Sequence, residues 1–182
     1  MRTNHYPKIK KQSKEDRQLE LVLLLREADL LSNIQIKVAL SYQERFPCFC
    51  FEEIFALNGW IEPHTWDFFA NKWVKLVKTK YRKPLGYYLW KSGLLKKSDI
   101  DAILLEQQTI PYRFGKIAVM RGYAKPSTIN FFLKYLFPEE LGESSLRTFD
   151  SLIRSKRRHQ LYYREVIRRR KLSKEKSLQK PS

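Results

Sequence analysis

The sequence predicts an all-α protein with four helix–turn–helix repeats arranged as two small four-helix units, plus a basic C-terminal helix. The main observation is a template that occurs four times: an apolar run, a small turn residue and a second apolar stripe, all at helical spacing. In addition, no stretch alternates apolar and polar residues as a half-buried strand would. The four copies cover residues 21–43, 51–73, 85–107 and 114–136.

Each copy opens with an apolar run that is followed by a residue suited to ending a helix. Gly59, Gly93 and Gly122 stand where a helix often ends in the left-handed backbone conformation, which costs glycine little. Asp29 has this place in the first copy, and a short polar side chain also tolerates that conformation. We therefore expect one helix to end at each of these four residues.

The second helix of each copy begins with a start signal. Ser32 is a candidate N-cap, Pro63 and Pro126 fall in a first turn, and Ser98 with Asp99 serves the third copy. Apolar residues then recur at helical spacing and are expected to be buried. They are Ile36, Ala39 and Leu40; Trp66, Phe69 and Ala70; Ile100, Ile103 and Leu104; and Ile129, Phe132 and Leu133.

The formal net charge of +17 lies mostly outside the repeats. Residues 1–18 have a net charge of +4 and residues 147–182 one of +10. A short helix–turn–helix cannot bury its own apolar face, so we expect the copies to pack in pairs. The predicted segments are a basic N-terminal arm, 1–18; a first repeat pair, 19–74; a basic linker, 75–83; a second repeat pair, 84–138; a basic C-terminal helix, 139–172; and a disordered tail, 173–182.

The second repeat pair carries a specific motif. Its first copy has Leu85-Gly86 and closes with Gln107, and after a spacer of five residues the next copy opens with Arg113-Phe114-Gly115. This pattern resembles the MshE-type N-terminal domain, which precedes the motor in type II secretion and type IV pilus assembly ATPases. In that family, two motif copies with such a spacer hold one cyclic di-GMP.

The resemblance implies a site for cyclic di-GMP as a regulatory ligand, and no other cofactor. Arginine offers a planar charged fork to guanine and phosphate, and glycine lets main chain approach a ligand. Packing and capping of a helical scaffold is the other interpretation of the same residues, and both stay open. The residues implied in ligand binding are Leu85, Gly86, Leu89, Gln107, Arg113, Phe114, Gly115 and Ile117.

The motif is incomplete in places. Pro84 and Leu136 replace an arginine and a glutamine of the second pair. In the first pair, Val22 and Glu52 take the glycine positions, and a glutamate would repel a phosphorylated ligand. We therefore interpret the first pair as structural.

Sequence motifs for catalysis are not found. There is no G-x-x-x-x-G-K-[ST] phosphate loop, and the three histidines are scattered. Cys48 and Cys50 are too few for a zinc site and poorly spaced for a disulfide, which indicates a reduced, cytoplasmic protein. The longest apolar run, Leu21–Leu25, is too short for a transmembrane segment. We expect no enzyme and no metal site.

The basic segment after the repeats is the other candidate for function. From about Ser144 it has apolar residues on one side of a predicted helix and many bases around them. Such a helix suits RNA or DNA, an anionic membrane surface or an acidic protein. The candidate polyanion-binding residues are Arg154, Lys156, Arg157, Arg158, Arg164, Arg168, Arg169, Arg170 and Lys171.

Two function classes follow from these features. The resemblance favours a non-enzymatic adaptor that binds a protein partner, a component of pilus or secretion machinery, in the cytoplasm or peripherally at the inner face of the membrane. The alternative is a nucleic-acid-associated protein that binds RNA or DNA through its basic tails. The adaptor is preferred because basic tails are common and unspecific, whereas the motif spans two helices and a spacer.

Overall fold

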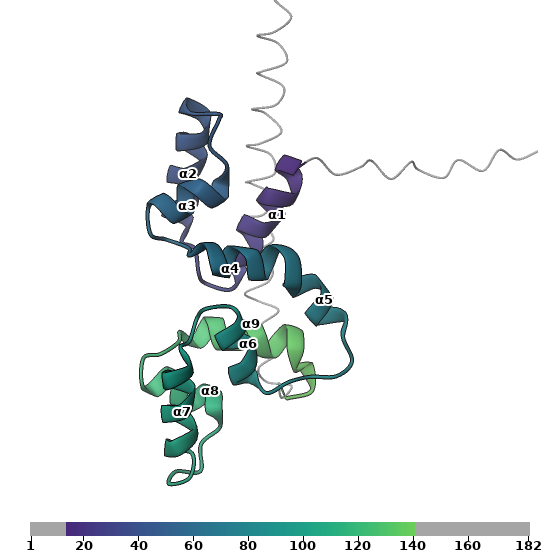
Figure 1. Ribbon diagram of the computed structural model, residues 1–182, viewed down its shortest axis with the longest axis vertical. Coiled ribbons are helices and arrows are strands. Elements are labelled where there is room, and N and C mark those ends of the chain that lie inside the picture. The colour runs from purple at the N-terminus through teal and green to yellow at the C-terminus, as the bar shows by residue number, and fades with distance from the viewer. Residues whose placement is uncertain (1–13, 141–182) are drawn as a thin grey trace, which may run out of the picture. The chain divides into compact units, whose positions relative to one another are not determined.

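The computed structural model describes residues 14–140 (Figure 1), and every regular element within that range is helical, which confirms the all-α prediction. The N-terminal arm up to residue 13, the C-terminal segment from 141 and the tail lie outside the described residues. The helices of the four copies are α1 (Lys14–Glu27), α2 (Asn33–Arg45), α3 (Phe51–Leu57), α4 (Pro63–Asp67), α6 (Leu85–Lys91), α7 (Lys97–Glu106), α8 (Phe114–Met120) and α9 (Pro126–Leu136).

All four residues predicted to end a helix have left-handed backbone. Their φ angles are 60° at Asp29, 63° at Gly59, 76° at Gly93 and 73° at Gly122. In each turn the next amide donates back into the helix that has just ended, as Leu94 N does to Leu89 O at 2.9 Å. This bond is typical of a helix that ends in a left-handed residue. The four turns are therefore built alike.

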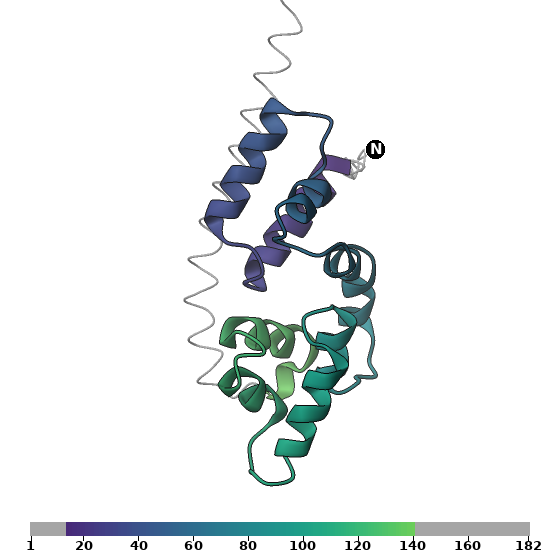
Figure 2. The ribbon, with the colours of Figure 1, turned by 60° about the vertical axis from the view of Figure 1, so that its left-hand side comes forward.

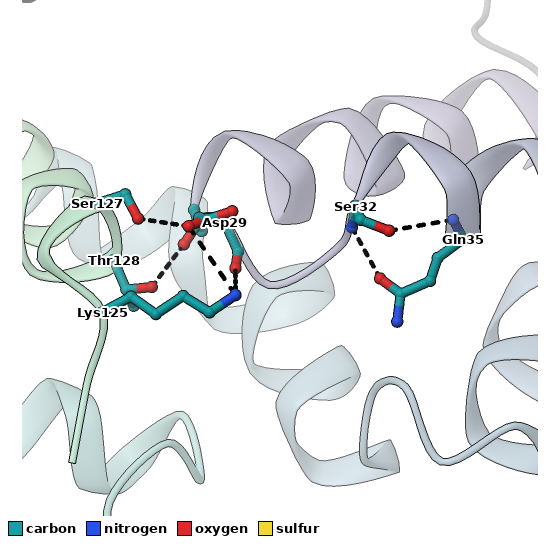
Figure 3. Close-up of polar contacts among 7 residues, drawn as sticks. Asp29, Ser32, Gln35, Lys125, Ser127 and Thr128 are labelled. Atoms are coloured by element: carbon teal, nitrogen blue, oxygen red, sulfur yellow. Dashed lines mark hydrogen bonds and ion pairs between the residues drawn. The ribbon is translucent and has the colours of Figure 1, made fainter. Parts of the chain in front are cut away.

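The predicted helix starts are confirmed with one exception. The Ser32 hydroxyl accepts from Gln35 N at 3.2 Å, while the Gln35 side chain accepts from Ser32 N at 2.8 Å (Figure 3). Pro63 and Pro126 are the first residues of α4 and α9. The prediction for Ser98 is wrong, because α7 already begins at Lys97, and it is the Asp99 carboxylate that accepts from Lys96 N at 2.8 Å.

The second helix of copy two is longer than predicted. From α4 it continues through a π-helical turn, η1 (Phe68–Lys72), into α5 (Trp73–Lys78), so the first residues of the predicted linker are helical. A π turn holds one residue more than an α turn and thus rotates the following residues. Phe68, Phe69 and Trp73 are buried as a result, whereas Ala70, predicted to be buried, is exposed.

Aromatic residues from different copies form part of the core. The Trp73 and Phe131 rings are stacked at 4.9 Å between centroids, and Phe69 lies 5.3 Å from Trp73. In α7, Leu104 was predicted to be buried but is exposed. This helix packs through a narrow face, on which Ile103 is the fully buried residue. Apart from Ala70, the apolar residues predicted at the other second helices are buried or half-buried.

Two buried threonines join parts of the chain that are distant in sequence. The Thr65 hydroxyl donates to Ser92 O at 2.8 Å, and the Thr128 hydroxyl donates to Ala28 O at 2.9 Å. Each threonine lies two residues after the proline that starts its helix, and each carbonyl lies at a helix end, where carbonyls lack intrahelical partners. Copy two is thus bonded to copy three and copy four to copy one. The grouping into two four-helix units stays a prediction.

The chain divides into two compact units, 1–131 and 132–182. Of the second unit, the described residues form the end of α9 and a 3-10 turn, η2 (Pro138–Glu140), with Phe137 N donating to Leu133 O at 2.7 Å. Among residues 14–140, no helix has the length and apolar character needed to cross a membrane.

Asp29 differs from its three glycine counterparts in having a side chain with partners. The Ser127 hydroxyl donates to the Asp29 carboxylate, and Lys125 Nζ donates to Asp29 O at 3.0 Å (Figure 3). These contacts from the start of α9 lie beside the bond between Thr128 and Ala28. They explain how an aspartate is kept in a conformation that favours glycine.

We predict that Asp29→Ala unfolds at a lower urea concentration than Asp29→Gly. Both variants lose the carboxylate, but only alanine places a Cβ on left-handed backbone, at a cost of about 1–2 kcal/mol. Urea denaturation followed by circular dichroism measures the difference directly. Equal free energies of unfolding for the two variants would show that residue 29 is not held in the left-handed region.

Candidate functional site

The residues implied in ligand binding meet where α6 contacts α8. Leu85 and Phe114 are the first residues of these helices, and each is followed by a glycine. A methyl group on Gly86 would lie 2.9 Å from Cζ of Phe114. A methyl group on Gly115 would lie 3.4 Å from Cδ2 of Leu85 and 2.8 Å from Cγ2 of Ile129. Each helix therefore places its first side chain over the glycine of the other.

The two glycines serve close helix packing in this structure. Gly86 and Gly115 are both buried, and the surfaces that a ligand would approach are covered by the chain's own side chains. Glycine permits this approach because it has no Cβ. The packing interpretation thus accounts for both glycines, and contact with a ligand is not needed to explain them.

Two further residues of the predicted set belong to the core. Leu89 and Ile117 have no exposed surface. Leu89 also supplies the carbonyl that receives the amides of Leu94 and Leu95 in the turn. A ligand on the folded protein would not touch these two side chains.

The remaining residues of the set lie nearer the surface. Gln107 caps the end of α7, and its side-chain amide donates to Tyr112 O at 3.0 Å, across the spacer. Arg113 is the exposed N-cap residue of α8, while Leu85 and Phe114 are half-buried. The structure therefore brings the predicted set together but leaves only part of it accessible.

Sequence reasoning missed Tyr112 and Lys116. The Lys116 ammonium lies 3.7 Å from the centroid of the Tyr112 ring, a close cation–π contact, and both residues are exposed. Their spacing of four residues at the start of a helix was the available signal. We use the term crossing rim for the accessible residues of this region: Leu85, Tyr112, Arg113, Phe114 and Lys116.

An ion pair joins α7 to the end of α8. The Arg121 guanidinium donates to both carboxylate oxygens of Glu106, at 2.8 and 2.7 Å. This hydrogen bonding lowers the pKa of Glu106 and raises the pKa of Arg121. Glu106 lies just before the spacer that leads to the crossing rim. Arg121 therefore offsets a negative charge that is close to the rim in sequence.

The first repeat pair lacks this pair of glycines. Val22 is buried in α1, and Glu52 is half-buried in α3. The Glu53 carboxylate accepts from Cys50 N at 2.7 Å and so caps α3. The interpretation of the first repeat pair as structural stays a prediction.

The two cysteines lie near the start of α3. Burial raises the pKa of the Cys50 thiol, and both Cys50 and the exposed Cys48 are free cysteines.

His64 and the acidic side chains are the other candidates for chemistry among the described residues. His64 is exposed, and its Nε2 lies 2.9 Å from Lys91 O, a polar contact between copies two and three. Within residues 14–140, no group of three or more His, Cys, Asp or Glu side chains is placed to hold a metal ion. The nine candidate polyanion-binding residues, from Arg154 to Lys171, lie outside the described residues.

Comparison with known proteins finds a related sequence. The chain is 36% identical over 120 residues to an uncharacterized protein of Picosynechococcus sp. strain PCC 7002, and the match covers 66% of this chain and 65% of that protein. No family model matches the chain. No solved structure matches it either. The resemblance to the MshE-type domain thus rests on the motif residues and stays a prediction.

We predict that Gly86→Ala destabilises the fold by about 1–3 kcal/mol, the usual cost of overpacking, because its methyl group would collide with the Phe114 ring. In a Phe114→Leu background the same change should cost less, since the ring is gone. Urea denaturation of the four proteins of this double-mutant cycle gives the coupling. Additive effects of the two substitutions would show that Phe114 does not pack on Gly86.

Proposed function

We propose that the protein is a non-enzymatic adaptor, like the input domain it resembles, which holds cyclic di-GMP on the crossing rim and docks on a protein partner. The observation that carries the proposal is the gathering of the motif residues at one helix contact, with Arg113 on its surface. Leu85 and Gly86 come from copy three, and Phe114 and Gly115 come from copy four, so the contact brings the two halves of the motif together.

The crossing rim offers the chemistry that a cyclic dinucleotide needs. Its two phosphates call for cations, and the ammonium of Lys116 and the guanidinium of Arg113 lie at the start of α8. Arginine can also bind a guanine edge or a phosphate with two parallel hydrogen bonds. The exposed Tyr112 ring offers a face for a purine, and the half-buried Leu85 and Phe114 offer apolar edges.

The members of the implied set outside the crossing rim have a supporting role. Gly86 and Gly115 bring α6 and α8 close enough for Leu85 and Phe114 to reach the rim. Gln107 holds the spacer through Tyr112 O and so orients the residues that follow it. In this proposal, the ligand contacts the rim and not the core residues Leu89 and Ile117.

A protein partner is supported by an exposed apolar stripe on α2. The stripe consists of Ile34, Val38, Tyr42 and Phe46, which follow one another at intervals of four residues, and Ile34 is 74% exposed. Figure 2 shows α2 along its length, and α3 packs against it. A stripe of this spacing fits the apolar face of an amphipathic helix from a partner. By resemblance, that partner is a component of pilus or secretion machinery at the inner face of the membrane.

The ligand part of the proposal is tested by calorimetry with cyclic di-GMP at low salt. We expect the wild type to bind and Arg113→Ala to weaken binding at least about tenfold, the effect of losing one charge-assisted hydrogen bond. Arg45→Ala, which removes the same charge from the end of α2, is the matched control and should bind as the wild type does.

Two results would contradict this proposal. One is the absence of heat from the wild type at micromolar ligand. The other is an equal loss of affinity in the Arg113 and Arg45 variants, which would indicate attraction by overall charge instead of a site. Circular dichroism of each variant checks that the helices are retained.

A further inference from the structure

The segment that joins the two repeat pairs has a high positive charge that the adaptor function does not use. Between Asp67 and Asp99 the chain contains nine Lys or Arg residues and no Asp or Glu. The connector proper, Thr79–Pro84, leaves α5 and leads to α6 (Figure 1). Four of the nine bases precede Tyr81 and two follow it directly.

The backbone of the connector is held in place by hydrogen bonds at both ends. The Thr79 hydroxyl donates to Lys75 O at 2.8 Å, and the Arg82 guanidinium donates to Val77 O at 2.9 Å and to Leu76 O. Both contacts satisfy carbonyls at the end of α5. Lys83 N donates to the Tyr88 hydroxyl at 2.9 Å, which ties the connector to α6. The connector therefore has a defined path between the two helices.

Three aromatic side chains are exposed in the connector and in the helix that follows it, Tyr81 in the connector and Tyr87 and Trp90 in α6. Tyr81 is 91% exposed, Tyr87 is 38% exposed and Trp90 is 41% exposed. The Tyr87 and Trp90 rings lie 6.3 Å apart between centroids, and Lys91 Nζ lies 4.3 Å from the centroid of Trp90. Leaving aromatic surface in water forgoes the gain from burying it. Packing within residues 14–140 does not explain the exposure of Tyr81.

We infer that this surface binds single-stranded nucleic acid. Its residues, which we call the connector surface, are Lys78, Lys80, Tyr81, Lys83, Tyr87 and Trp90. Proteins that bind single strands combine cations that follow the backbone with aromatic rings on which bases stack. The connector surface has both: Tyr81 lies between Lys80 and Lys83 in the connector, and Tyr87 and Trp90 follow in α6. A duplex keeps its bases stacked inside, so it would meet the lysines but not the rings.

The inference is independent of the adaptor function. The connector surface shares no residue with the crossing rim or with the apolar stripe of α2. It also differs from the basic residues between Arg154 and Lys171, which bring charge but few aromatic rings. Failure of one proposal therefore leaves the other unaffected.

The test measures fluorescence anisotropy of labelled oligouridine, oligodeoxythymidine and a matched duplex with the full chain. We expect both single strands to bind more tightly than the duplex. The comparison of oligouridine with oligodeoxythymidine shows whether RNA or DNA is preferred. Trp90→Ala and Tyr81→Ala should each weaken single-strand binding about fivefold or more, as expected for the loss of one stacked base. Tyr123→Ala, which removes a 37% exposed ring from the turn after α8, is the matched control and should change nothing.

The charge contribution is measured from the dependence on salt. Replacing Lys78 and Lys80 with Gln should reduce the slope of log affinity against log salt by about 0.7 per lost phosphate contact. The same change at Lys37 and Arg45 of α2 should leave the slope as it is.

Several outcomes would overturn the inference. They are no binding at low salt, equal or tighter binding of the duplex, and unchanged affinity in both aromatic variants. The last would assign binding to charge alone. All three substituted rings are exposed, so each variant should keep its fold. Thermal unfolding of each variant checks this and shows whether a loss of affinity comes from a loss of fold.

Discussion

Two threonine hydroxyls, each bonded to a carbonyl at the end of a helix in a distant copy, hold the repeats of this protein together. Thr65 bonds Ser92 O, and Thr128 bonds Ala28 O. All four residues are buried, so a carbonyl left without its partner would cost about 1–3 kcal/mol. The two bonds are placed equivalently, one from copy two to copy three and one from copy four to copy one, so the first and last copies are joined although they are far apart along the chain.

Both candidate surfaces depend on the first of these bonds. Ser92 caps α6, whose first turn brings Leu85 and Gly86 against α8 and whose exposed side carries Tyr87 and Trp90. The bond from Thr65, with the contact between His64 and Lys91 O, attaches the end of α6 to the start of α4. The connector between α5 and α6 thus spans two points that are already fixed. This explains how a short, highly charged stretch keeps a defined path.

Much of the local structure could be predicted from the sequence, because its signals act over a few residues. Gly93 and Pro126 mark a helix end and a helix start without help from the rest of the chain. The π turn at Phe68–Lys72 and the roles of Thr65 and Thr128 could not, since both depend on what packs opposite. A glycine such as Gly86 is ambiguous for the same reason. Sequence shows that something approaches it closely but not that Phe114 does.

Hydrogen exchange of single amides shows whether the two threonine bonds hold distant copies together. We predict that Thr128→Val speeds exchange in the turn after α1, where Leu30 N donates to Leu25 O, about a hundred residues away in sequence. Thr65→Val should do the same in the turn after α6, at Leu94 N. Faster exchange confined to the helix that carries each substitution would show instead that the distant copies are not held by these bonds.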